Sequence, residues 1–185
     1  MYSQQTDLSA ASVAADCAGW HFCAMLLAEP DAESLAILSE QAGLRDWLAP
    51  ALHELSAMPL DAWQGEHTHL FTFPAVCPPF ATAYLEEGTL NGHRAAALES
   101  YYAALGLRPT GLPADYLGTI CECAAFLCEH GDRVVLQDFC QDYLGDWLDR
   151  FLEDLRTKSN ILLYQGLALE LGSLVYELLN DEVTA

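Results

Sequence analysis

The sequence predicts an all-α protein, folded as a single-domain helical bundle over residues 1–185. Apolar residues recur at steps of three and four from Leu136 to Phe151, which is the period of an amphipathic helix. The segment 161–179 is apolar nearly all round, so we expect it at the centre of the bundle. No alternating apolar and polar run competes with these patterns, and we therefore expect no strand.

Signals for helix ends place the elements in chain order. Ser9 or Ser12 can cap a first helix that ends before Pro30, and Asp31 can cap the next. The expected buried residues of the first helix are Val13, Cys17, Trp20, Ala24, Leu27 and Ala28. The helices expected after it cover about 32–42, 45–56, 60–71, 94–105, 115–130, 136–151 and 161–179.

The segment 72–92 interrupts the helical pattern. It contains Pro74, Pro78, Pro79, Gly88 and Gly92, which do not continue a helix, and it is too long for a simple turn. Function is often found in a long ordered loop of a compact domain. We therefore expect 72–92 to be a functional proline-rich loop.

The charge of the chain limits its partners. It has 27 acidic and 7 basic residues, a net charge of −20. Phosphate groups would be repelled over a Debye length of about 8 Å, which argues against nucleic acid and anionic lipid. Asp138, Asp142, Asp146 and Asp149 share the outer face of the expected 136–151 helix. Solubility alone explains such a surface, and a cationic partner is the other interpretation.

Cysteine usage and hydropathy indicate a cytoplasmic protein. Seven cysteines, an odd number, are spread mostly through helix-like sequence, and this favours free thiols in the core of a protein from a reducing compartment. Residues 1–7 lack the basic and apolar regions of a secretory signal. No apolar run reaches the roughly 18 residues of a membrane span, so none is expected.

Catalytic and metal sites have little support. Glu66, His67 and His69 are spaced so that neighbouring side chains diverge on a helix. The three cysteines between 121 and 128 lack Cys-x-x-Cys spacing, and we expect buried thiols there. No phosphate-binding loop or nucleophile motif occurs. We expect no catalytic residue, no metal and no cofactor.

Asp115 has two compatible interpretations. It precedes the expected 115–130 helix, where an N-cap carboxylate is worth about 1 kcal/mol. A cap carboxylate at the mouth of a groove can also receive an arginine, and the neighbouring Tyr116 offers a ring face and a hydroxyl to the same cation.

Five segments occur in an order and spacing that are specific when taken together. They are Glu66-His67-Thr68-His69-Leu70-Phe71, Pro78-Pro79-Phe80-Ala81-Thr82-Ala83-Tyr84-Leu85, Tyr102-Ala103-Ala104-Leu105-Gly106, Pro113-Ala114-Asp115-Tyr116-Leu117 and Ala124-Ala125-Phe126-Leu127. Over about 66–175 they resemble the TorD/DmsD family of redox enzyme maturation chaperones. The chain departs from the family at Tyr116 and Tyr143, where the family has histidine, and at Thr82, where serine is usual.

The resemblance implies an all-helical cytosolic chaperone. Such a protein binds the twin-arginine signal peptide of a molybdoenzyme precursor, assists cofactor insertion and prevents premature export. The peptide presents two guanidinium groups before an apolar stretch, so its receptor needs carboxylates beside an apolar groove. The residues expected to bind it are Leu70, Phe71, Pro79, Phe80, Tyr84, Pro113, Asp115, Tyr116 and Glu122. Asp115 and Glu122 would take the arginines. For Leu70, Phe71 and Tyr84, core packing is the alternative.

Two other functions stay open. A nucleotide hydrolase could hold Mg²⁺ with Asp115, Glu122 or Glu129, although the chain has few Lys and Arg residues for a phosphate clamp. A helical adaptor would bind a mature redox subunit instead of its leader. The sequence is compatible with a monomer or with a domain-swapped dimer.

Overall fold

The computed structural model describes residues 17–85 and 92–180, and these fold almost entirely into helices. The first helix is described over Cys17–Leu26, so the expected caps and Val13 lie outside the described residues. The elements that follow are α2 (Ser34–Glu40), the 3₁₀ helix η1 (Ala42–Leu44), α3 (Leu48–Ser56), α4 (Leu60–Phe71), α5 (Ala81–Leu85), α6 (His93–Ala104), α7 (Leu117–His130), α8 (Arg133–Tyr143), α9 (Leu148–Lys158) and α10 (Leu162–Asn180). Within the described ranges no strand forms, which confirms the all-α prediction.

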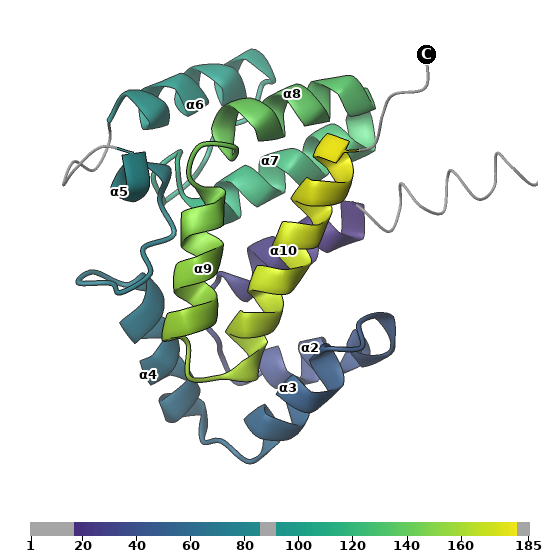
Figure 1. Ribbon diagram of the computed structural model, residues 1–185, viewed down its shortest axis with the longest axis vertical. Helices are drawn as coiled ribbons and strands as arrows, with labels where there is room; N and C mark the ends of the chain where they lie inside the picture. Colours follow the sequence, from purple (N-terminus) through teal and green to yellow (C-terminus); the bar gives the residue numbers. More distant parts are fainter. Residues whose placement is uncertain (1–16, 86–91, 181–185) are drawn as a thin grey trace, which may run out of the picture.

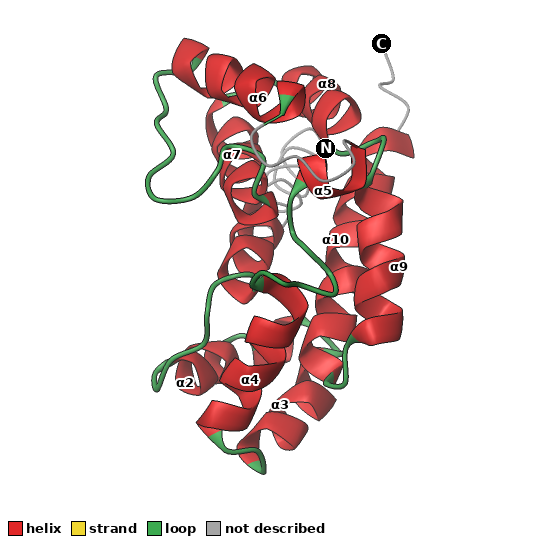
Figure 2. Ribbon diagram, turned by 90° about the vertical axis from the view of Figure 1, so that its left-hand side faces the viewer, coloured by secondary structure: helices red, strands yellow, loops and turns green. Residues whose placement is uncertain are grey.

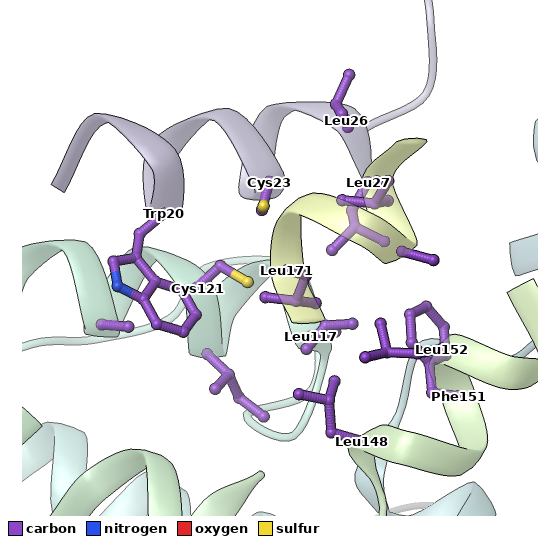
Figure 3. Close-up of a cluster of buried hydrophobic side chains, with 14 of the residues drawn as sticks. Trp20, Cys23, Leu26, Leu27, Leu117, Cys121, Leu148, Phe151, Leu152 and Leu171 are labelled. Atoms are coloured by element: carbon purple, nitrogen blue, oxygen red, sulfur yellow. The ribbon is translucent and has the colours of Figure 1, made fainter. Parts of the chain in front are cut away.

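The helices form two groups joined by a central pair. α9 and α10 lie side by side, with α6, α7 and α8 near one end of the pair and α2, α3 and α4 near the other (Figures 1 and 2). The core runs between the groups. In Figure 3, Trp20 and Cys23 of the first helix lie near Cys121 of α7, and Leu171 of α10 lies among Leu117, Leu148 and Leu152; every one of these side chains is buried.

α10 is the central helix, as its sequence indicates. It buries Leu163, Tyr164, Leu167, Leu171, Val175 and Leu178, among others. By length and composition it is also the one described helix that could cross a membrane, which differs from the expectation that no segment is long and apolar enough. Its contacts with α3, α8 and α9 are those of a core helix, and core helices pass the same test.

The prediction of one helix over 136–151 is wrong. α8 ends at Tyr143 and α9 starts at Leu148, with a turn between them. The spacing hides this break because Leu144 and Trp147, both in the turn, are buried in the same core as the helices around them. The indole N–H of Trp147 donates to the Tyr143 carbonyl at 2.7 Å, which fixes the turn. Asp138, Asp142, Asp146 and Asp149 are exposed, but they are divided between two helices and this turn.

The expectation of free thiols holds for five cysteines and is wrong for two. Cys17 forms a disulfide with Cys128, which joins the first helix to α7. The two residues are 111 positions apart, so their pairing leaves no local sequence signal. The other cysteines are free and buried: Cys23, Cys77, Cys121, Cys123 and Cys140. Burial raises the pKa of the Cys77 thiol to about 12, so this residue of the proline-rich loop is an inert thiol.

Candidate functional site

The proline-rich loop is fastened to the start of α7. The Leu117 N–H donates to the Pro79 carbonyl at 2.8 Å, and the Ala81 N–H donates to the Asp115 carbonyl at 3.2 Å. The rings of Phe80 and Tyr116 pack with centroids 5.5 Å apart. The structure thus brings together four of the predicted site residues: Pro79, Phe80, Asp115 and Tyr116.

Asp115 lies inside this junction, with 1% of its surface exposed. One carboxylate oxygen, Oδ2, accepts from the Thr82 backbone N–H at 3.0 Å and from the Thr82 hydroxyl at 2.6 Å. The other oxygen, Oδ1, is buried without a hydrogen-bond partner. The N-cap interpretation is wrong, because Tyr116 is the residue before α7 and Asp115 accepts from the start of α5 instead. In this conformation the carboxylate joins two segments and is closed to solvent.

Two further tyrosine contacts hold the junction in place. The buried Tyr102 hydroxyl donates to the Ala114 carbonyl at 3.0 Å, next to Asp115. The Tyr116 hydroxyl donates to the Leu27 carbonyl at 2.6 Å, at the end of the first helix. Burial raises the pKa of Tyr116, so it stays a neutral donor. Its ring lies over Gly118, where a Cβ atom would collide with it.

A surface cavity of about 260 Å³ opens beside Tyr116. Glu122 lies one helical turn beyond Gly118 on α7, is exposed, and lines the same cavity. The opposite wall is the 105–113 link, which carries Arg108 and Leu112. The full lining is Ala24, Ala28, Arg108, Pro109, Thr110, Leu112, Tyr116, Gly118, Thr119 and Glu122.

The link bends at two glycines with left-handed backbone, Gly106 at φ 77° and Gly111 at φ 85°. A neighbouring cavity of about 160 Å³ shares Arg108, Pro109, Thr119 and Glu122 with the first. Arg108 was missed in the sequence; its position between Gly106 and Pro109, in a chain with 7 basic residues, is the signal that marks it.

The remaining predicted site residues lie outside this junction or at its edge. Leu70 is fully buried, and Phe71 packs edge-on against Tyr164 of α10 with centroids 5.1 Å apart, so both are core residues. The half-buried Tyr84 stacks on Trp147 at 5.7 Å, and its hydroxyl donates to Asp154 at 3.1 Å. Pro113 precedes the junction, and its carbonyl accepts from the Tyr116 N–H at 3.1 Å.

Two residues of the segment 66–71, which resembles a family motif, bind the turn before α10 and α10 itself. The Glu66 carboxylate accepts from the Asn160 backbone N–H at 2.6 Å and from its side-chain amide at 3.1 Å, tying α4 to the turn before α10. His67 is buried, with Nδ1 3.0 Å from the Tyr164 hydroxyl. Burial lowers the pKa of His67, and nearby Glu29 opposes this shift.

The acidic residues considered for Mg²⁺ do not converge. One Asp115 carboxylate oxygen accepts a hydrogen bond from the Thr82 hydroxyl, and the Glu129 carboxylate lies 3.0 Å from His21 Nε2. Across 17–85 and 92–180, no group of three or more His, Cys, Asp or Glu side chains is arranged to hold a metal ion.

The described residues form an all-helical fold in which the proline-rich loop is joined to the start of α7. A solved structure from Archaeoglobus fulgidus, described as that of a candidate redox enzyme maturation protein, has the same fold. It aligns with a TM-score of 0.62 at 24% identity, covering 88% of this chain and 93% of that one. No curated protein matches the chain.

Family membership follows from residues 27–153, which match the family described as nitrate reductase delta subunit. The match spans more than half of the sequence, and the chain belongs to this family. The resemblance to TorD/DmsD-type redox enzyme maturation proteins is thereby confirmed.

Proposed function

We propose that the protein is a cytoplasmic chaperone that binds the twin-arginine signal peptide of a molybdenum-containing oxidoreductase precursor. It would hold the peptide while the cofactor is inserted and so prevent early export. The observation that carries this proposal is the cavity that Glu122 and Tyr116 share.

The cavity has the chemistry that a guanidinium group requires. The Glu122 carboxylate is exposed and has no hydrogen-bond or ion-pair partner among the described residues, so a guest arginine can pair with it in a bidentate manner. The half-buried Tyr116 ring offers a face to the same cation. A net charge of −20 favours the encounter with a basic peptide over a longer range.

The buried Asp115 contributes by position. Its hydrogen bonds to Thr82 hold the proline-rich loop against the start of α7 and thereby position the Phe80 ring against the Tyr116 ring. Among the predicted residues, Glu122 is therefore the direct arginine acceptor, whereas Asp115 and Pro79 fix the geometry around it.

The test is peptide binding measured by calorimetry at two salt concentrations. The wild-type protein should prefer a peptide with an Arg-Arg pair over the same peptide with Lys-Lys. Glu122→Gln should weaken binding about tenfold, equivalent to about 1.4 kcal/mol, and should reduce the salt dependence. Glu99→Gln, on the exposed side of α6, makes the same charge change and should do neither. Equal affinity for both peptides in the wild-type protein would refute the proposal.

Arg108 gives a second test of the same cavity. Because it shares the walls with Glu122, it competes with a guest cation, and Arg108→Gln should tighten binding several-fold. The control is Arg156→Gln, which alters the net charge equally at an exposed pair with Glu153. Tighter binding in both variants to the same degree would mean that only the overall charge matters.

A further inference from the structure

A second cavity shares Ala28 with the one just described. It measures about 210 Å³ and lies between the end of the first helix, α2, α4 and α10. Ala28 lines both cavities, so the two are neighbours across the residues that follow the first helix. The apolar part of its lining is Met25, Leu26, Ile37, Leu38, Trp63 and Leu163.

Two hydrogen bonds fix residues in the walls of this pocket. The Trp63 indole N–H donates to the Tyr164 hydroxyl at 3.2 Å, and the Gln64 amide donates to the Pro30 carbonyl at 2.8 Å. Leu26, Leu38 and Trp63 are buried, whereas Ile37 at the edge is 43% exposed. An apolar cavity of about 150 Å³ holds a benzene molecule, so this pocket has room for one large aliphatic or aromatic side chain.

The rim of the pocket carries one available carboxylate. Glu29 is exposed and has no hydrogen-bond or ion-pair partner among the residues of 17–85 and 92–180. Asp31, also on the rim, is already engaged, because its Oδ1 accepts from the Glu33 N–H, the Ser34 N–H and the Ser34 hydroxyl at 2.8–3.0 Å. A pocket with apolar walls and one available carboxylate at its rim suits a peptide in which an apolar side chain lies next to a basic one.

From these contacts we infer that the pocket is a second subsite for the same peptide. It takes the first large apolar side chain after the arginine pair, while Glu29 takes one arginine and Glu122 takes the other. The inference rests on the proposed function. Side chains of adjacent residues in an extended peptide point to opposite sides. Glu29 lines this pocket and Glu122 lines the first cavity, and the two cavities share Ala28. A second copy of this chain, with its own charge of −20, is a poor occupant because it would be repelled.

The position of the peptide is tested by photo-crosslinking. A synthetic Arg-Arg peptide carries photoreactive leucine at its first apolar position, and the crosslinked residues are found by mass spectrometry. Crosslinks to Met25 or Ile37 are expected. Crosslinks confined to other surfaces would overturn the assignment.

A double-mutant cycle tests the energetics. Ile37→Gln should weaken binding of the leucine peptide roughly tenfold, since burial of one leucine is worth about that factor in affinity. It should have no effect on a peptide with alanine at this position. Val135→Gln on α8 is the matched control, because Val135 is 41% exposed and distant in the fold from the pocket. Glu29→Gln should reduce the preference for Arg-Arg over a peptide with a single arginine.

The outcomes separate the two claims. If Ile37→Gln and Val135→Gln behave alike while the wild-type protein still prefers Arg-Arg peptides, the subsite is refuted and the proposed function stands. If the wild-type protein shows no Arg-Arg preference, both are refuted. Thermal unfolding of each variant is measured alongside, and the exposed substitutions are expected to leave the melting temperature unchanged.

Discussion

Removing the hydrogen bonds between Thr82 and Asp115 should destabilise the protein and loosen the site. Both side chains are buried, and Asp115 Oδ2 accepts from the Thr82 N–H and hydroxyl at 3.0 and 2.6 Å. Hydrogen bonds to a charged group contribute about 1.5–3 kcal/mol each. The unpartnered Oδ1 offsets part of this, because burying an incompletely paired carboxylate is costly. We expect Asp115→Ala to lower the free energy of unfolding by about 3 kcal/mol.

The assay is a double-mutant cycle with urea denaturation of the wild type, Thr82→Val, Asp115→Ala and the double variant. Thr82→Val removes only the hydroxyl bond, so the coupling energy should be about 1.5–3 kcal/mol. A coupling below about 0.5 kcal/mol, the usual limit for independent sites, would refute a stabilising bond.

Peptide binding by Asp115→Asn separates two roles of this residue. If the carboxylate acts by holding the loop, affinity falls while the salt dependence keeps its slope. A flattened slope, like the one expected for Glu122→Gln, would instead show that an arginine of the peptide pairs with Asp115 itself.

Three further outcomes test other parts of the structure. Reducing the Cys17–Cys128 disulfide should lower the free energy of unfolding by up to about 4–5 kcal/mol, because the disulfide closes a loop between residues that are 111 positions apart. Urea unfolding with and without dithiothreitol measures this change. Dithiothreitol should have no effect on the variant in which both cysteines are replaced by serine. Burial lowers the pKa of His67 below the unfolded value of about 6.5, so the unfolded state binds more protons and stability should fall as the pH drops below about 6.5. His67→Gln should reduce that fall, and an unchanged pH profile would contradict the assignment. Gly118→Ala should displace the ring of Tyr116 and break its bond to the Leu27 carbonyl, which lowers peptide affinity about fivefold; calorimetry showing wild-type affinity would argue against a binding role for Tyr116.

The fold class could be predicted because helical periodicity and end signals are local. The 60–71 helix with Pro59 before it, and the central helix near 161–179, both appear close to the expected limits. The turn between α8 and α9 could not be predicted, because buried Leu144 and Trp147 continue the apolar spacing through it. Periodicity records which residues face the core and does not record that the chain has turned.

The candidate site could be predicted only in part, because its geometry depends on contacts between distant segments. Phe80 and Tyr116 do meet. Asp115 looked like a helix cap in the sequence, since a local pattern cannot show that Thr82, 33 residues away, takes its carboxylate. Glu29 lines a cavity formed by several segments and no local motif marks it, whereas the local signal for Arg108 is that it is one of few basic residues and lies between Gly106 and Pro109.

Two bonds attach the described part of the first helix to α7. The Cys17–Cys128 disulfide joins it to the later part of α7, and the hydroxyl of Tyr116, the residue before α7, donates to the Leu27 carbonyl. Ala28 directly follows this second attachment and lines both cavities, so a movement of the backbone at Ala28 would change the walls of both cavities at once.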